Sequence, residues 1–245
     1  MELTFPTTPR EAGRGILISF LPLRAGAGAA TLACMTGLIA CNHYDTSIVD
    51  LNQDSKVRSY LGFQDLSAST VSILDINGVA TPEGIFSASE QHHSGLKVFP
   101  GVSPRVLDAS QIDTQLTLKA VTYLKKTSPL TIAVVNPLHS SWMAAMLSDM
   151  VCLVAKPDRP NMDAFRETTD FLNRLGCSDR LTIILNQTGY TGGLEVKGAI
   201  NYYSPDMVIG YDKFIPEMSN RRVLEPNKKI RAELFSLVKE VIADA

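Results

Sequence analysis

Continuously hydrophobic runs are the strongest pattern along this chain. Five of them are rich in branched residues and do not alternate with polar positions: 15–23 (GILISFLPL), 46–50 (TSIVD), 130–136 (LTIAVVN), 150–155 (MVCLVA) and 181–186 (LTIILN). Unbroken runs of this kind are typical of parallel strands that are covered on both faces. Shorter runs at 96–99 and 207–209 are two further strand candidates.

The segments between these runs have a helical period. Apolar residues recur at every fourth position at Ile112, Leu116, Ala120 and Leu124, with Ser110 as a candidate N-cap. The last predicted helix carries its apolar residues on one face: Ile230, Leu234, Leu237, Val238, Val241 and Ile242. Strands that alternate with helices predict an α/β fold, doubly wound, in which helices cover both faces of a mainly parallel sheet.

Composition and charge narrow the class of protein. Hydrophobic residues make up 45% and charged residues 20%, which is typical of a globular chain rather than a disordered or fibrous one. The 23 Lys and Arg residues nearly balance the 25 Asp and Glu residues, so the net charge gives no signal for a nucleic-acid partner. We expect the basic residues at 221–231 to form a solvated face, and one domain to span 1–245.

The cysteines and the length of the apolar runs exclude other classes. The four cysteines are widely spaced, with no C-x-x-C pair and no histidine at ligand spacing, so no metal site is predicted. No apolar run reaches the roughly 18 residues that a membrane-spanning helix needs. The sequence therefore predicts a cytoplasmic protein without a transmembrane segment.

The loop after the first predicted strand is the main candidate site. It reads RAGAGAAT and leads into a helix rich in alanine and leucine. Small residues let a ligand approach the backbone, and a helix start presents free N–H groups at the positive end of the helix dipole. This combination favours a phosphate group. The nucleotide-binding residues predicted here are Arg24, Ala25, Gly26, Ala27, Gly28, Ala29, Ala30 and Thr31.

Two chemistries remain open on this loop alone. Gly26, Gly28 and Thr31 form an altered dinucleotide fingerprint, and Asp50 ends the next strand about 20 residues later, where a ribose-binding acid would lie. The other interpretation is a P-loop in which the lysine has become Ala29 and the magnesium-binding hydroxyl residue has become alanine as well.

The loop also resembles a family motif, the deviant Walker A sequence K-G-G-x-G-K-[ST]-T of the ParA/MinD-type ATPases, which belong to the SIMIBI class of P-loop proteins. In this resemblance Arg24 stands at the signature lysine, Ala29 at the P-loop lysine, Ala30 at the magnesium ligand and Thr31 at the last threonine. The motif is therefore degenerate, because its second lysine and its hydroxyl residue are both replaced by alanine.

Further segments resemble the same family over nearly the whole chain. The segment 46–62 (TSIVDLNQDSKVRSYLG) is similar to the family's second strand and its V-D-L-D-x-Q motif, with Asp50 at the first acid and Asn52 at the second. The run that ends at Pro137 is similar to a Walker B strand, with Asn136 in or beside the Asp position. The metal-supporting acids of the family are thus partly replaced by amides.

The resemblance extends to the nucleotide base and to one branch of the family. It implies that Asn186, at the end of LTIILN, contacts the adenine base, and it places Tyr211 in the tail that borders the nucleotide. The segment 95–101 (GLKVFPG) and the overall length are most similar to the CpaE/TadZ branch, which positions or assembles surface pili and includes members with atypical Walker motifs.

These resemblances imply that nucleotide binding persists while hydrolysis is weak or lost. A charge acting at about 4 Å is worth on the order of 4 kcal/mol at an effective dielectric of about 20, and Ala29 cannot supply it. We expect a pseudo-ATPase that binds ATP or ADP through backbone amides, with Mg²⁺ disfavoured, and that acts as a positioning or assembly factor for a pilus or secretion machine. Asp50 is the remaining candidate catalytic residue.

Two other functions stay open. An active ATPase would use Arg24 as the cation of a non-standard P-loop. A dinucleotide-binding oxidoreductase would use Gly26, Gly28 and Asp50, although no Ser-Tyr-Lys or similar proton relay is visible.

Association is the mode of action that the resemblance implies. We expect a homodimer, or a heterodimer with a related ATPase, together with other assembly proteins and with peripheral membrane contact through those partners. The expected contact surface combines the loop around Arg24 with residues 139–146, in which Trp142 is a candidate aromatic anchor.

Overall fold

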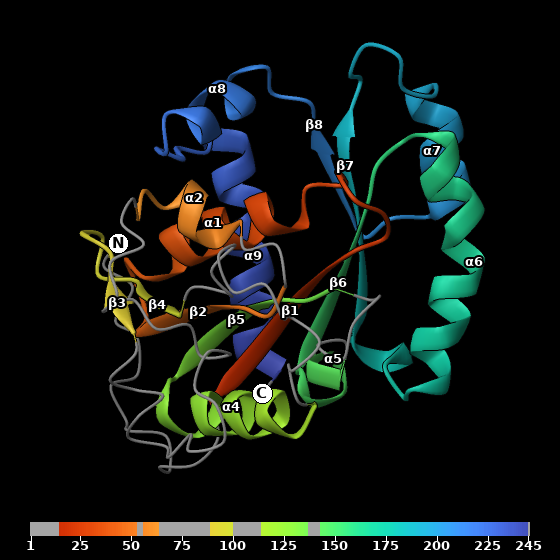
Figure 1. Cartoon of the computed structure of the whole chain (residues 1–245). Coiled ribbons are helices and arrows are strands. Elements are labelled where there is room, and N and C mark those ends of the chain that lie inside the picture. Colours follow the sequence, from red (N-terminus) through yellow and green to blue (C-terminus); the bar gives the residue numbers. More distant parts are fainter. Residues whose placement is uncertain (1–14, 53–55, 64–88, 100–113, 137–142, 245) are drawn as a thin grey trace, which may run out of the picture.

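The computed structural model describes residues 15–52, 56–63, 89–99, 114–136 and 143–244, which form one sheet covered by helices (Figure 1). The strands are β1 (Ile16–Pro22), β2 (Thr46–Asp50), β3 (Glu90–Gln91), β4 (Lys97–Phe99), β5 (Leu130–Val134), β6 (Met150–Ala155), β7 (Leu181–Thr188) and β8 (Met207–Gly210). The helices are α1 (Ala29–Ala40), α2 (Val57–Tyr60), α4 (Thr114–Thr127), α5 (Met143–Leu147), α6 (Arg159–Arg174), α7 (Val196–Tyr203), α8 (Phe214–Asn220) and α9 (Lys228–Asp244). A 3-10 turn at Ser178–Arg180 precedes β7.

The order of the strands brings one set of loops together. The sheet runs β3-β4-β2-β5-β1-β6-β7-β8, and its pairs are parallel except for β3 with β4. Because these parallel strands share one direction, the loops that follow β1, β2, β5, β7 and β8 leave from the same edge. In open α/β sheets this carboxyl edge is where ligands bind.

The side chains of the central strands alternate between two hydrophobic cores. In β1, Ile16, Ile18 and Phe20 belong to the core that contains α1 and α9, whereas Leu17 and Leu21 face the core formed with α4, α5, α6 and α7. Strands β2, β5 and β6 are buried along their whole length. Burial on both faces explains why these strands show no alternation of hydrophobic and polar residues.

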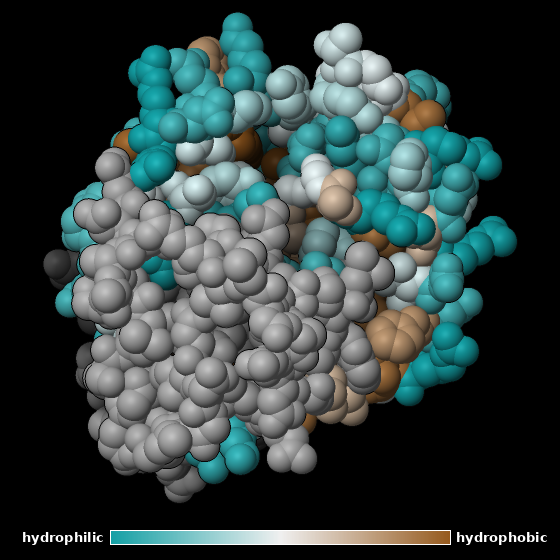
Figure 2. Space-filling model, in the orientation of Figure 1, coloured by the Kyte–Doolittle hydropathy of each residue, from teal (hydrophilic) through white to brown (hydrophobic). Residues whose placement is uncertain are grey.

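The helices α6 and α1 begin in different ways. The Asp158 side chain accepts a hydrogen bond from the Asn161 N–H at 3.0 Å, and Pro160 lies in the first turn of α6. The outer side of α6, at the right of Figure 2, is covered mainly by hydrophilic residues. Helix α1 instead follows Gly28, which has φ of 96° and offers no side-chain cap. The first N–H groups of α1 therefore remain available at the carboxyl edge.

The predicted fold class is confirmed, and so are the strands. Each predicted run contains a strand whose ends lie within two residues of the expected ones, and the last predicted helix is α9. The four-residue stripe belongs to α4, but Ser110 and Ile112 lie outside the described residues. The helices α6, α7 and α8 and the antiparallel β3 were not predicted. Within the described part of the chain, no helix combines the length and apolarity needed to cross a bilayer.

Candidate functional site

A cavity of about 510 Å³ opens at the carboxyl edge of the sheet, beside the start of α1. Its walls come from the loop after β1, from α1 and α2, from the ends of β5, β7 and β8, and from α8. The lining residues are Pro22, Ala25, Gly26, Gly28, Ala29, Ala30, Thr31, Leu32, Asn52, Lys56, Tyr60, Val134, Asn136, Asn186, Gln187, Gly210, Tyr211, Asp212, Ile215, Pro216, Ser219 and Asn220. Segments that are far apart in the sequence thus share one pocket.

The glycines of the loop set the backbone path into this cavity. Gly26 and Gly28 have φ of 84° and 96°, in the region that residues with a Cβ rarely adopt. The Ala27 N–H donates to the Arg24 carbonyl at 3.1 Å, and the Leu32 N–H donates to the Gly28 carbonyl at 3.0 Å. The N–H groups of the first turn of α1 precede that bond, so they have no partner inside the helix and lie where the dipole attracts an anion.

Two amide side chains from the end of β7 hold this loop. Asn186 Nδ2 donates to the Ala27 carbonyl at 2.8 Å, and Gln187 Nε2 donates to the Gly26 carbonyl at 3.0 Å. Gln187 has a left-handed φ of 59°, at a shift in the β7–β8 register. A Cβ at Gly28 would lie 2.3 Å from Asn186 Nδ2. The loop carbonyls are therefore bound to β7, and glycine is required at position 28 for close approach.

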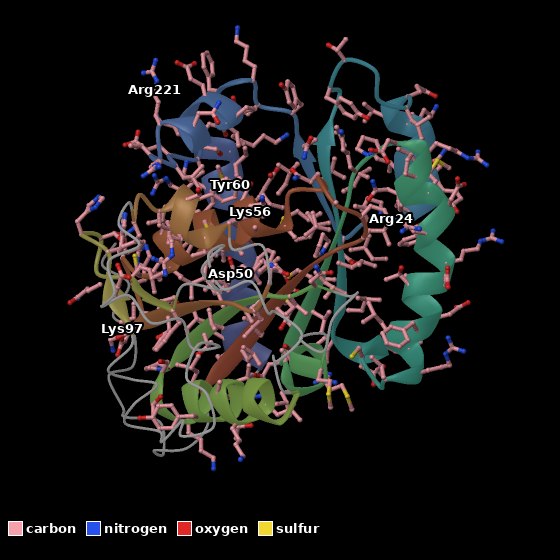
Figure 3. The ribbon with its side chains drawn as sticks, viewed as in Figure 1. Arg24, Asp50, Lys56, Tyr60, Lys97 and Arg221 are labelled. Atoms are coloured by element: carbon pink, nitrogen blue, oxygen red, sulfur yellow. The ribbon has the colours of Figure 1, made fainter. Side chains whose placement is uncertain are left out.

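Most of the predicted nucleotide-binding residues line the cavity: Ala25, Gly26, Gly28, Ala29, Ala30, Thr31, Asn186 and Tyr211. Ala27 is fully buried, and neither it nor Arg24 is part of the lining. Arg24 is exposed, and Figure 3 shows it on the side of the loop nearer α6, away from Lys56 and Tyr60. Because the side-chain amide of Asn186 donates its hydrogen bond to the Ala27 carbonyl, Asn186 holds the loop in this structure. That these residues bind nucleotide stays a prediction.

Asp50, the candidate catalytic residue, is fully buried at the end of β2. Its Oδ1 accepts the Asn52 N–H at 3.0 Å, and its Oδ2 accepts the N–H groups of Lys56 at 2.9 Å and Val57 at 3.1 Å. The carboxylate does not line the cavity. These contacts are those of a side chain that shapes a loop and caps α2, and they give no support to a catalytic or a ribose-binding role.

A buried thiol next to this network is not a nucleophile. Cys34 lies within α1, and burial, with a smaller effect of the Asp50 carboxylate, raises the pKa of its thiol well above the usual value. The reactive form of cysteine is the thiolate, which this environment disfavours.

Lys56, Tyr60 and Gln187 line the cavity but were missed as candidate site residues in the sequence. The signal for two of them was present, because Asn52, Lys56 and Tyr60 recur at four-residue spacing after Asp50. From the sequence alone, this spacing does not show which surface the segment after β2 faces. The structure shows that all three residues line the cavity.

The charged groups of the cavity are few. Among its described lining residues, Lys56 and Asp212 carry charge. Asp212 accepts the Phe214 N–H and the Asn227 side-chain amide, each at 2.9 Å, so it is engaged in the turn before α8. Lys56 is thus the lining side chain that brings positive charge.

Among the residues that the structure describes, the wall of the cavity presents no set of side chains that fits a magnesium site. The fold positions that would supply a hydroxyl and acids hold Ala30, Asn52 and Asn136, and the Asp50 carboxylate lies outside the lining. Over the residues that the structure describes, no three His, Cys, Asp or Glu side chains come together as a metal site would require. Magnesium prefers carboxylate and water oxygens in an octahedral arrangement, and the one carboxylate among the described lining residues, that of Asp212, is already bound in the turn before α8.

The other end of the cavity suits a planar apolar ring. Tyr211, Ile215 and Pro216 line it from β8 and α8, and the Tyr211 side chain is 45% exposed. The ring of Tyr190 lies 6.5 Å from that of Tyr211, centroid to centroid. A flat base can stack on such an aromatic surface.

No protein-family model matches the chain, and no curated protein matches it. Solved structures do. The septum site-determining protein MinD of Pyrococcus horikoshii, in complex with Mg-ADP, has a TM-score of 0.75 at 18% identity, covering 93% of this chain and 96% of that chain. A ParA family ATPase of Chlorobium tepidum has a TM-score of 0.75 at 12% identity, covering 93% and 98%. The MinC:MinD cell division complex of Aquifex aeolicus gives 0.73 at 16%, covering 94% and 97%.

The chain has the fold of the MinD and ParA ATPases. At these identities the likeness establishes the fold alone. The strand order also settles the choice left open by the loop, because a dinucleotide-binding fold places its second strand beside its first. Here β5 lies between β1 and β2. Together with the buried carboxylate of Asp50, this order rules out the dinucleotide interpretation of Gly26, Gly28 and Asp50.

The described part of the expected contact surface is not a single patch. Trp142 and the rest of 137–142 lie outside the described residues. The following residues form α5, which leads into the amino end of β6, whereas the loop around Arg24 follows the carboxyl end of β1. Since β1 and β6 are parallel neighbours, α5 lies at the amino ends of these strands and the Arg24 loop lies at their carboxyl ends. The prediction that Met146 and the Arg24 loop belong to one contact surface is therefore wrong.

Proposed function

We propose that this chain is a MinD/ParA-type protein that binds a nucleoside diphosphate or triphosphate in the cavity at the start of α1 and serves as a positioning or assembly factor. The observation that carries the proposal is the loop itself. It retains the backbone path of a phosphate-binding loop, with Gly26 and Gly28 at positive φ and the first turn of α1 open to the cavity.

The relatives in fold support both parts of the proposal. MinD of Pyrococcus horikoshii is a septum site-determining protein bound to Mg-ADP, and MinD of Aquifex aeolicus forms a complex with MinC. By analogy, this chain binds ADP or ATP and acts through a partner protein or a second copy of itself. A place in the CpaE/TadZ branch, with a pilus or secretion machine as its cargo, is the finer form of the same proposal.

Hydrolysis is the part of the family chemistry that this chain has lost under the proposal. Ala29 and Ala30 stand at the start of α1, where a lysine would stabilise the charge that develops on the γ-phosphate and a hydroxyl would hold the metal. Alanine supplies neither. The backbone amides survive both substitutions, so phosphate binding and phosphoryl transfer are separated.

The test is a titration of the full chain with ATP, ADP and NAD, each with Mg²⁺ and with EDTA, followed by an assay for phosphate release. We expect binding of ATP and ADP, no binding of NAD, and phosphate release at the level of a protein-free control. The double variant Ala29→Lys with Ala30→Thr is the informative comparison, because it restores the two missing groups. Turnover by the unmodified chain at the rate of that variant would contradict the pseudo-ATPase proposal.

A working ATPase that uses Arg24 is the second candidate. Arg24 is exposed and outside the lining of the cavity, so under this candidate it would act on a nucleotide across the interface of a dimer. In that case the rate of phosphate release per protein molecule would rise with protein concentration, because more of the chain would be dimeric. This release would be lost in Arg24→Ala. If Arg24→Ala leaves phosphate release unchanged, this candidate is excluded.

A further inference from the structure

The cavity must supply positive charge to hold a phosphate group, and its loop lacks the usual source. Helix α1 presents backbone N–H groups and the positive end of its dipole, but Ala29 is uncharged. A helix dipole alone contributes little to binding a charged group near a surface, because water and salt screen it. A nucleotide carries several negative charges on its phosphates, so a side-chain cation is needed as well.

Lys56 comes to the cavity from a different element than the loop. It precedes α2 in the segment after β2, whereas the usual lysine would belong to α1. Figure 3 shows Lys56 and Tyr60 beside α1, and both residues line the cavity. The Tyr60 N–H donates to the Lys56 carbonyl at 3.0 Å, and residues four apart in a helical turn share a face. Both side chains therefore reach the same wall.

The backbone of Lys56 is held in place by a buried carboxylate. Asp50 Oδ2 accepts the N–H groups of Lys56 and Val57, and its Oδ1 accepts the Asn52 N–H. Because Asp50 is itself buried at the end of β2, the start of α2 is anchored to the sheet next to the loop. The position of Lys56 is thus determined by the core of the fold, and this gives the buried acid a role other than catalysis.

We propose that Lys56 replaces the missing P-loop lysine and binds the phosphates of a nucleoside diphosphate or triphosphate without a divalent metal ion. This inference rests on the proposed function, since it concerns the same cavity. Its second support comes from the described lining, in which Ala30, Asn52 and Asn136 supply no hydroxyl or carboxylate ligand for magnesium. Where no metal ion neutralises the phosphate charge, the lysine must do so.

The experiment measures the dissociation constant of a fluorescent ADP analogue, with adenosine as competitor, in Mg²⁺ and in EDTA. The chains compared are the unmodified protein, Lys56→Met, Lys56→Arg and Lys229→Met. Lys229 is an exposed lysine of α9 outside the cavity and serves as the matched control. Circular dichroism and thermal unfolding establish that each variant is folded.

We expect the dissociation constant of the unmodified chain for the ADP analogue to differ by no more than about twofold between Mg²⁺ and EDTA. Lys56→Met should weaken that binding about 10- to 100-fold, the loss of one charge-assisted contact, while its affinity for adenosine is unchanged. Lys56→Arg should restore most of the affinity, and Lys229→Met should have no effect.

The outcomes separate this inference from the proposed function. No binding of the ADP analogue by the unmodified chain would overturn the proposed function itself. Binding that Lys56→Met leaves intact would overturn the role of Lys56 alone. Binding that disappears in EDTA would overturn metal independence. A Lys56→Met chain that fails to fold leaves the decision to Lys56→Arg and to the comparison of Mg²⁺ with EDTA.

Discussion

Replacing Gly28 by alanine should destabilise the protein through two separate effects. A residue with a Cβ costs roughly 1–2 kcal/mol in the left-handed region, and Gly28 has φ of 96°. The new Cβ would also lie 2.3 Å from Asn186 Nδ2, which must move and give up its hydrogen bond to the Ala27 carbonyl. That bond is worth about 0.5–1.5 kcal/mol. The sum is about 1.5–3.5 kcal/mol of unfolding free energy, or roughly 10- to 400-fold in the folding equilibrium.

The neighbouring glycine provides a matched control. Gly26 has φ of 84°, yet a Cβ built there meets no atom within 4 Å. Gly26→Ala should therefore show the backbone strain alone, about 1–2 kcal/mol. The assay is urea denaturation of both variants, monitored by circular dichroism and fitted with a common slope.

A double-mutant cycle tests the cause of the difference. In an Asn186→Ala background the amide 2.3 Å from the new Cβ is gone and Gln187 Nε2 remains at 3.3 Å, so the cost of Gly28→Ala should fall close to that of Gly26→Ala. The reasoning is refuted if the two glycine variants are equally destabilised in the unmodified chain, or if Asn186→Ala leaves the cost of Gly28→Ala unchanged.

Three further predictions concern the base end of the cavity, a turn histidine and a helix cap. Tyr211→Ala should weaken ADP and adenosine alike, about tenfold, because stacking acts on the base rather than on the phosphates; competition titrations measure this. Burial, with a smaller effect of His93, lowers the pKa of His92 below its usual value near 6.5. Between the lowered pKa of the folded chain and the usual pKa of the unfolded chain, the unfolded chain binds more protons, so the unfolding free energy falls as pH drops from about 6.5. His92→Gln should make the unfolding free energy from urea titrations depend less on pH in this range. Asp158→Ala should lower the melting temperature by about 2–4 °C, the effect of losing a cap worth about 1 kcal/mol at the start of α6.

The strands could be predicted because their burial is written into the local sequence. A strand such as β6 is buried on both faces, and every position from Met150 to Ala155 is accordingly apolar. Among the helices that the sequence did not predict, α6 has clear local signals in Asp158 and Pro160, whereas those of α7 are weak. Helix α7 contains two tyrosines and a glycine, and its first turn has no side-chain cap. Tertiary packing of Ala199 and Tyr203, which no local pattern shows, stabilises it.

The loop of the candidate site was also predictable, but its surroundings were not. Small residues between a strand and a helix indicated from the sequence alone a loop at the start of a helix, and the structure places this loop in the wall of the cavity. The amides that hold it belong to β7, about 160 positions later, and the geometry of Gln187 depends on a register shift. The sequence offers Arg24 as the cation of an active ATPase, because it lies in the loop at the position of the signature lysine. Lys56 is the lysine that the fold brings to the cavity.

Under the proposed role of Lys56, a cation just before α2 changes how the site holds a phosphate. A lysine in the loop moves with the first turn of α1, whereas Lys56 is fixed to β2 through Asp50. Phosphate bound between Lys56 and the start of α1 would therefore join two elements that meet the sheet on separate strands, β2 and β1. Binding of this kind stabilises the arrangement of α1 and α2 without any bond being broken, by an amount that depends on ligand concentration. Under the proposed function, ADP and ATP act on this site as structural ligands, and the signal to a partner is occupancy rather than hydrolysis.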